Sequence, residues 1–139
     1  MQHKKMIGSV GISQMVVRPG DTCLAHGSGD MAILAASFLV TLMESSCNSA
    51  IAEYLDNGES TVLQKLELTI SGSVGIGTEI QGSATCIDAM SDIVIFQCEV
   101  HDGNRLLASS IMERIIVERV SFLARNAAFT LISQQSNEN

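Results

Sequence analysis

The pattern of apolar and polar positions is helical in one long stretch of the chain. No glycine or proline interrupts residues 37–55, and Asn57 with Gly58 gives a left-handed C-cap signal directly after them. At about 100° per residue, one face of such a helix is continuously apolar. That face comprises Leu39, Val40, Met43, Cys47, Ala50, Ile51, Tyr54 and Leu55. The pattern therefore predicts a single long helix that is buried along this face.

Outside this helix the apolar period is two, which indicates β-strands. The predicted strands are 9–18, 61–71, 78–88, 92–101 and 106–118. Pro19-Gly20 reads as a turn after the first strand, and Asp102-Gly103-Asn104 predicts a hairpin between the last two. Residues 119–134 fit either a last strand or a short helix. Residues 1–8 and 134–139 are expected to be loose tails.

One strand, a long helix and four further strands joined mostly by short turns describe an α+β domain. We expect the hotdog fold, in which an antiparallel sheet of about five to six strands wraps around a central helix. The whole chain, residues 1–139, is expected to form a single domain. The open edges of such a sheet need protection, so we expect two copies to pair as a homodimer.

Composition and charge narrow the possible functions. The net charge is −7 and the chain has no Trp, so it lacks the basic face that binds phosphate backbones, and nucleic acid is not an expected partner. The longest nearly apolar run, 31–43, has about 13 residues against the roughly 20 that span a bilayer, so no membrane partner is expected. The four cysteines show no CxxC pairing and no ligand spacing with histidine. Without a signal-peptide pattern, this predicts reduced thiols, a cytoplasmic location and neither metal nor cofactor.

One residue departs from the helical pattern. Glu44 falls at the edge of the apolar face, between the directions of Ile51 and Leu55. A carboxylate in that position must find a partner, shift its pKa or take part in chemistry. We therefore take Glu44 as the candidate catalytic residue, a general base or nucleophile. The alternative is a retained carboxylate without a catalytic role, satisfied by hydrogen bonds to Ser or Thr groups across the dimer.

Several segments together resemble the fluoroacetyl-coenzyme A thioesterase-like branch of the hotdog superfamily. The resemblance covers roughly residues 9–125. Its most specific part is the sequence of the predicted helix around Glu44, together with the spacing from there to Gly58. It is carried by Gly27-Ser28-Gly29-Asp30-Met31, Phe38-Leu39-Val40-Thr41-Leu42-Met43-Glu44, Tyr54-Leu55, Gly58-Glu59, Thr61-Val62 and Glu113-Arg114. It implies a homodimer with an acyl-thioester pocket near the helix N-terminus at the subunit interface, occupied by acyl-CoA or another acyl thioester.

The resemblance also implies a catalytic threonine, glutamate and histidine. The glutamate is Glu44, whereas the threonine position holds Ala36 and the histidine position holds Ile70. A shift of one residue would place Ser37 or Thr69 there instead. The phenylalanines that form a lid in the fluoroacetyl-specific enzyme have no evident counterpart in residues 24–34. Two of the three catalytic positions thus lack the required chemistry.

Other candidates for substrate binding lie around this predicted pocket. His26 would replace the missing base if its loop, which includes Gly29, folded over the pocket; otherwise it is an exposed histidine. Ser37 is either a hydroxyl near the thioester or an N-cap. Gln64 would hydrogen-bond an acyl carbonyl or face water. Together with Ala36 and Ile70, these residues form our predicted substrate site.

Three functions remain open from the sequence. The first is a dimeric protein that binds an acyl thioester and hydrolyses it slowly through Glu44. The second is a non-catalytic hotdog protein, ligand-binding or structural, that has lost the threonine and histidine. The third, dehydration of a hydroxyacyl thioester, would need a histidine, and His26 is the available one.

Overall fold

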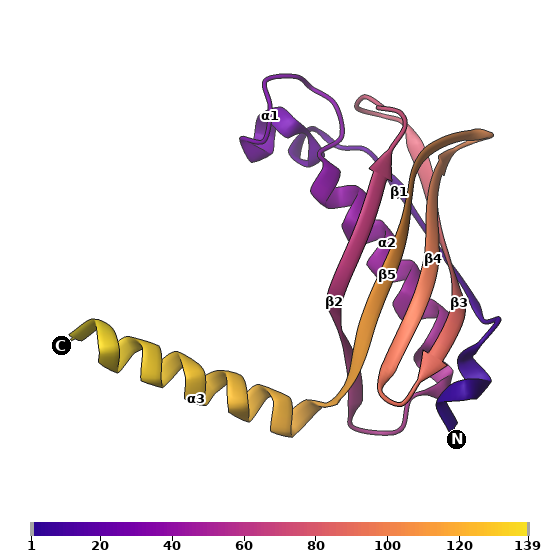
Figure 1. Cartoon of the computed structure of the whole chain (residues 1–139). Coiled ribbons are helices and arrows are strands. Elements are labelled where there is room, and N and C mark those ends of the chain that lie inside the picture. Colours follow the sequence, from indigo (N-terminus) through magenta and orange to yellow (C-terminus); the bar gives the residue numbers. More distant parts are fainter. Residues whose placement is uncertain (1, 139) are drawn as a thin grey trace.

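The computed structural model describes residues 2–138, and its central feature is one five-stranded antiparallel sheet (Figure 1). The strands follow the order β1-β3-β4-β5-β2. Their bounds are β1 Val10–Val16, β2 Glu59–Ile70, β3 Glu79–Met90, β4 Ile93–Asp102 and β5 Arg105–Glu118. The central helix, α2 (Ala36–Ile51), lies along one face of this sheet. The predicted α+β hotdog fold is therefore confirmed.

The remaining elements are short, except for one. They are η1 (Gln2–Met6), η2 (Pro19–Asp21), α1 (Cys23–His26), η3 (Ala52–Tyr54) and the long α3 (Arg119–Glu138). The predicted hairpin joins β4 to β5, with Asp102 opposite Arg105 and Gly103 at φ +56°. No helix of the described residues is long and apolar enough to cross a membrane.

Two glycines bring α2 close to the sheet. A Cβ at Gly11 on β1 would overlap the backbone carbonyl oxygen of Ser46, and a Cβ at Gly82 on β3 would lie 2.8 Å from Cγ of Leu42. Because neither strand carries a side chain at these points, α2 packs mainly on β1 and β3 and less on β4. The core between them is aliphatic and sulfur-rich, with Met43, Cys47, Phe96 and Met112 fully buried.

The central helix ends close to where the sequence predicts, but its last turn is a 3₁₀ helix. It runs to Ile51 and continues as η3 to Tyr54, after which Leu55 is extended. The expected C-cap at Asn57 and Gly58 is wrong: Gly58 has φ +91°, but it lies in the turn that leads into β2. The left-handed signal in the sequence therefore marks a turn rather than the helix end.

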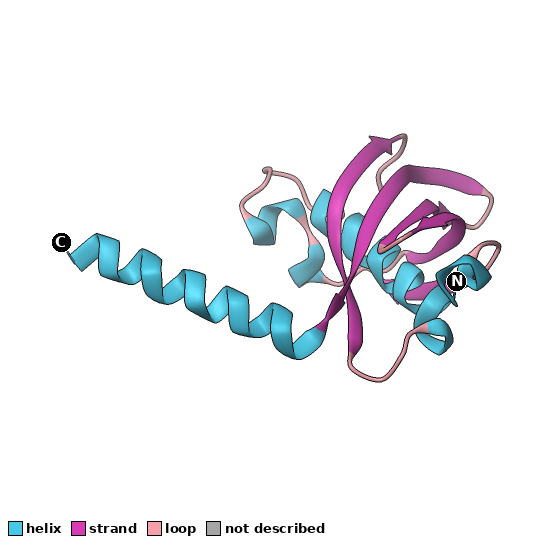
Figure 2. Cartoon of the chain, turned by 60° about the horizontal axis from the view of Figure 1, so that its bottom comes forward, coloured by secondary structure: helices cyan, strands magenta, loops and turns pink. Residues whose placement is uncertain are grey.

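Both ends of the described chain are more ordered than expected. Residues 2–6 form η1, and Met6 is fully buried rather than part of a loose tail. Residues 119–138 form α3, which resolves the alternatives left open for 119–134 and replaces the tail expected from 134 onward. Figures 1 and 2 show α3 extending away from the sheet. Most of its large apolar side chains are exposed, among them Val120, Leu123, Phe129, Leu131 and Ile132.

Candidate functional site

A small apolar cavity lies at the beginning of α2. Its volume is about 160 Å³, and two predicted site residues, Ala36 and Ile70, line it from α2 and from the end of β2. The other lining residues are Cys23, Ile33, Leu34, Leu39, Gly72, Ser73, Val74 and Leu107. The neighbouring positions Ser37 and Thr69 do not line it. Most of these side chains are hydrocarbon, so the cavity suits an apolar group.

Backbone hydrogen bonds hold the walls of this cavity. The N–H of Leu34 donates to the carbonyl of Val74 (2.9 Å), and the N–H of Ala35 donates to the carbonyl of Asp21 (2.9 Å). Ala35 is the N-cap of α2 and provides no side-chain cap. The first turn of α2 therefore lies beside the cavity, and no N-cap side chain accepts a hydrogen bond from its N–H groups. Such groups favour an oxygen that carries negative charge.

Glu44 lies in a different place and has a partner in its own chain. Its Oε2 accepts a hydrogen bond from Nη1 of Arg114 on β5 at 2.9 Å. The Arg114 side chain is 5% exposed and that of Glu44 is 34% exposed. Nε of Arg114 also donates to the hydroxyl of Thr61 (2.9 Å), and Nη2 donates to the Thr61 carbonyl (3.2 Å). The guanidinium is thus neutralised by Glu44 and held in place by β2.

The cavity and the ion pair are well separated within one chain. Ala36 and Glu44 are eight residues apart on α2, which corresponds to about 12 Å along the helix axis. On the sheet, Ile70 pairs with Ala108 and Leu63 pairs with Arg114, about 20 Å apart along β5. A short acyl group in the cavity therefore cannot place its thioester carbonyl against Glu44 of the same chain.

The other predicted substrate residues do not line the cavity. His26 is exposed, with its ring packed edge-on against Phe38 at a centroid distance of 4.9 Å. Ser37 is exposed, and because Ala35 is the N-cap, the predicted cap at Ser37 is wrong. Gln64 sits at a bulge in β2 and donates to Glu113 (3.2 Å).

Gly29 touches the cavity only indirectly. A Cβ there would lie 3.1 Å from Cβ of Cys23, one of the lining residues. Its loop is exposed. The loop therefore supports one wall of the cavity through Cys23 but does not close over it.

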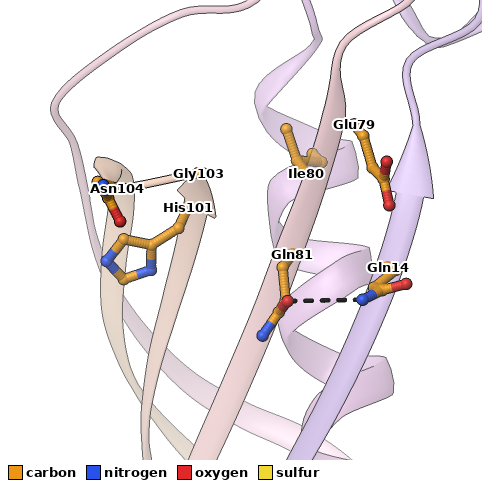
Figure 3. A pocket seen from close by; sticks show the side chains of 7 residues that line it. All are labelled: Gln14, Glu79, Ile80, Gln81, His101, Gly103 and Asn104. Atoms are coloured by element: carbon orange, nitrogen blue, oxygen red, sulfur yellow. Dashed lines mark hydrogen bonds between the residues drawn. The ribbon is translucent and has the colours of Figure 1, made fainter.

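A larger groove lies elsewhere, on β1, β3 and the β4–β5 hairpin (Figure 3). It measures about 600 Å³ and is lined by Gln14, Glu79, Ile80, Gln81, His101, Gly103 and Asn104. In it Gln14 donates to Gln81 at 3.5 Å. None of the predicted site residues belongs to this groove. Among residues 2–138, no three His, Cys, Asp or Glu side chains are grouped so that they could hold a metal ion.

Sequence reasoning missed the role of Arg114 and Thr61. A signal was present: on the buried face of β5, Ser110, Met112, Arg114 and Ile116 alternate, and Arg114 is the charged member of that row. A buried arginine requires an anion nearby. The pattern would have indicated that Arg114 needs an anion, but it does not set the packing that identifies Glu44 as that anion.

Comparison with known proteins places this geometry in a family. Residues 17–120 match the family model of FlK, described as a fluoroacetyl-CoA-specific thioesterase. No curated protein matches the sequence significantly. The match spans more than half of the chain and includes Ala36, Glu44, Ile70 and Arg114.

Solved structures support the fold. An FlK variant in complex with acetyl-CoA is 23% identical, with a TM-score of 0.84 over 89% of this chain and 98% of that one. A Thermus thermophilus protein described as a thioesterase superfamily member is 18% identical, with a TM-score of 0.81 over 96% of both chains. A hot-dog-like protein from Thermanaerovibrio acidaminovorans is 15% identical, with a TM-score of 0.82 over 92% of this chain and 96% of that one. The family model covers most of the chain, and the solved structures share its fold. The chain therefore belongs to the FlK fluoroacetyl-CoA thioesterase family of the hotdog thioesterase superfamily.

Proposed function

We propose that the protein binds a short acyl thioester, with acyl-CoA as the ligand class, and that the acyl group occupies the cavity between Ala36 and Ile70. The observation that carries this proposal is the cavity itself: the two positions at which the family resemblance places a threonine and a histidine line one apolar space. FlK structures have been solved with acetyl-CoA and with fluoroacetate and CoA. The first-turn N–H groups of α2 suit the thioester carbonyl oxygen.

The same geometry favours binding over hydrolysis within one chain. Ala36 and Ile70 offer no base or nucleophile, and Glu44 is about 12 Å along α2 from the cavity. One oxygen of Glu44 is already committed to Arg114. In this proposal Glu44 is the counterion of a buried arginine, and the protein is a binding member of a thioesterase family. A homodimer, in which two sheets pair at their edges, remains part of the proposal.

Hydrolysis through Glu44 is the second candidate, and one observation favours it. Glu44 is 34% exposed, and its Oε1 accepts no hydrogen bond from any described residue. That oxygen is free to bind a water molecule, and Arg114 would orient the carboxylate through its bond to Oε2. In a dimer the carbonyl would come from a thioester held by the partner subunit. This candidate makes Glu44 a general base and Arg114 a positioning residue.

A titration with CoA, acetyl-CoA, butyryl-CoA and hexanoyl-CoA tests the binding proposal. Each buried methylene contributes about 0.8 kcal/mol, so a four-carbon chain should bind roughly a hundredfold more tightly than CoA alone. Ala36→Leu fills the cavity and should remove most of this gain. Ser37→Leu introduces a leucine one residue later, outside the cavity, and should keep the gain in affinity. Equal affinity of CoA and all its esters would refute the proposal.

Release of free CoA thiol, measured on the same samples, decides between the two candidates. Binding without release above the buffer rate supports the binding function. If esters are hydrolysed and Glu44→Gln abolishes turnover while affinity is unchanged, the second candidate is correct and Glu44 is catalytic.

A further inference from the structure

Two thiols that the proposed function does not use face each other in the core. Cys47 on α2 and Cys98 on β4 are both fully buried, and their Sγ atoms are 3.5 Å apart. They are separated by 51 positions in the sequence. Sγ of Cys47 also lies 3.9 Å from Sδ of Met112. Three sulfur atoms, from α2, β4 and β5, therefore lie next to one another between the central helix and the sheet.

The two sulfurs differ in their readiness to ionise. The two sulfurs share a hydrogen bond in which either can be the donor. This hydrogen bond lowers the pKa of Cys98; burial opposes the shift, and Ser110 and the Arg114 charge lower the pKa further. The same hydrogen bond and burial raise the pKa of Cys47. Of the two thiols, Cys98 therefore ionises more readily, and Cys47 stays protonated beside it. Thiolate is the form of cysteine that reacts with oxidants.

Cys86 provides a natural comparison in the same core. It is also fully buried, but its Sγ lies 3.5 Å from the carbonyl oxygen of Asp88 and has no sulfur partner among the described residues. Burial raises the pKa of Cys86. All four cysteines, including the partly exposed Cys23, are free thiols. The Cys47–Cys98 pair is therefore distinguished by its geometry and not by burial alone.

We propose that Cys47 and Cys98 are a redox modification site, which a small peroxide such as hydrogen peroxide converts to a reversible disulfide. The Cys98 sulfur attacks one peroxide oxygen, the O–O bond breaks, and Cys98 becomes a sulfenic acid as the other oxygen leaves as water. The Cys47 sulfur then attacks the Cys98 sulfur and displaces the second oxygen as water. Two thiols are oxidised by two electrons, and one peroxide is reduced to two waters.

The structural change that this requires is small. The sulfurs must approach from 3.5 Å to about 2.0 Å, the length of a disulfide bond. The oxidant must be small because neither sulfur is exposed, and it enters when α2 moves briefly away from the sheet. The product links α2 covalently to β4. Since Glu44 lies one helical turn before Cys47, the cross-link fixes the helix segment that carries the Glu44–Arg114 pair.

Peptide mapping of the folded full-length protein after hydrogen peroxide treatment tests this proposal. We expect a peptide pair joined through Cys47 and Cys98 to appear, lighter by two hydrogen atoms than the two reduced peptides together, and to be lost on treatment with dithiothreitol. Cys86→Ala should leave the linked pair unchanged, whereas Cys47→Ala should eliminate it and leave Cys98 carrying added oxygen.

The mapping of the unaltered chain decides the question even if Cys47→Ala fails to fold. The proposal is overturned if Cys47 and Cys98 stay reduced when Cys23 is fully oxidised, or if Cys86 is oxidised at the same rate as Cys98. It is also overturned if Cys86 appears in the linked peptides, because such pairing requires unfolding.

Discussion

Replacing Glu44 with glutamine tests whether the carboxylate serves Arg114 or is available for chemistry. Removing one partner of a fully buried ion pair costs about 3–5 kcal/mol, whereas an exposed pair contributes about 0–1 kcal/mol. Here Arg114 is 5% exposed and Glu44 is 34% exposed, and Thr61 keeps two hydrogen bonds to the guanidinium. We therefore expect Glu44→Gln to lower the free energy of unfolding by about 2 kcal/mol, between these limits.

Urea unfolding followed by circular dichroism measures this loss. Glu53→Gln is the matched control, because Glu53 lies in the exposed η3 and has no ion pair among the described residues. Arg114→Met and the double variant complete a mutant cycle, and the double variant should lose less than the sum of the two single losses. A free energy of unfolding for Glu44→Gln within about 0.5 kcal/mol of the wild-type value would refute the counterion role.

Two further predictions concern the fold. Gly11→Ala should destabilise the protein by about 3 kcal/mol, because the added methyl group would overlap the backbone carbonyl of Ser46. A thermal melt measures this loss. Gly20→Ala is the control and should have little effect, because its added methyl group would meet no other atom. Hydrogen bonds from the Ser121 hydroxyl and N–H, with a weaker one from the Val120 N–H, lower the pKa of Glu118 at the start of α3. The resulting stabilisation of the helix start is present above the ordinary glutamate pKa and is lost as the pH falls through the lowered pKa. The Ser121 amide should therefore lose its protection from hydrogen exchange in acid. Glu118→Gln should abolish this pH dependence.

The fold followed from two periodicities in the sequence. The apolar face of residues 37–55 and the alternation in the later strands both arise from burial against one core, so local pattern and global fold agree. The end of the helix was predicted to within one residue, but its C-cap was misassigned because a left-handed glycine signal fits a turn as well as a C-cap. Gly58 supplies the turn, and α2 gives way to η3 once Ile51 has completed the apolar face.

The long α3 could not be predicted because it has almost no tertiary contacts. Its apolar residues are spread around the helix and largely exposed, so neither a period of 3.6 nor one of two emerges. What remains is intrinsic propensity: Ala124, Ala127 and Ala128 favour a helix, and no glycine or proline interrupts residues 119–138. This weak signal left the strand and helix alternatives open.

The site was only partly accessible from the sequence. The departure of Glu44 from the apolar pattern indicated a need for a partner, but the partner is 70 positions away and depends on how β5 lies against α2. The shared cavity of Ala36 and Ile70 depends in the same way on the register of β2 with β5. Periodicity assigns residues to faces, whereas contacts between elements are set by packing.

The structure of the protein with a non-hydrolysable butyryl-CoA analogue tests the central claim most directly. The account predicts the acyl chain between Ala36 and Ile70, with its carbonyl oxygen toward the first turn of α2 and the Glu44–Arg114 hydrogen bond intact. An acyl carbonyl against Glu44, or an analogue bound with the cavity left empty, would contradict it.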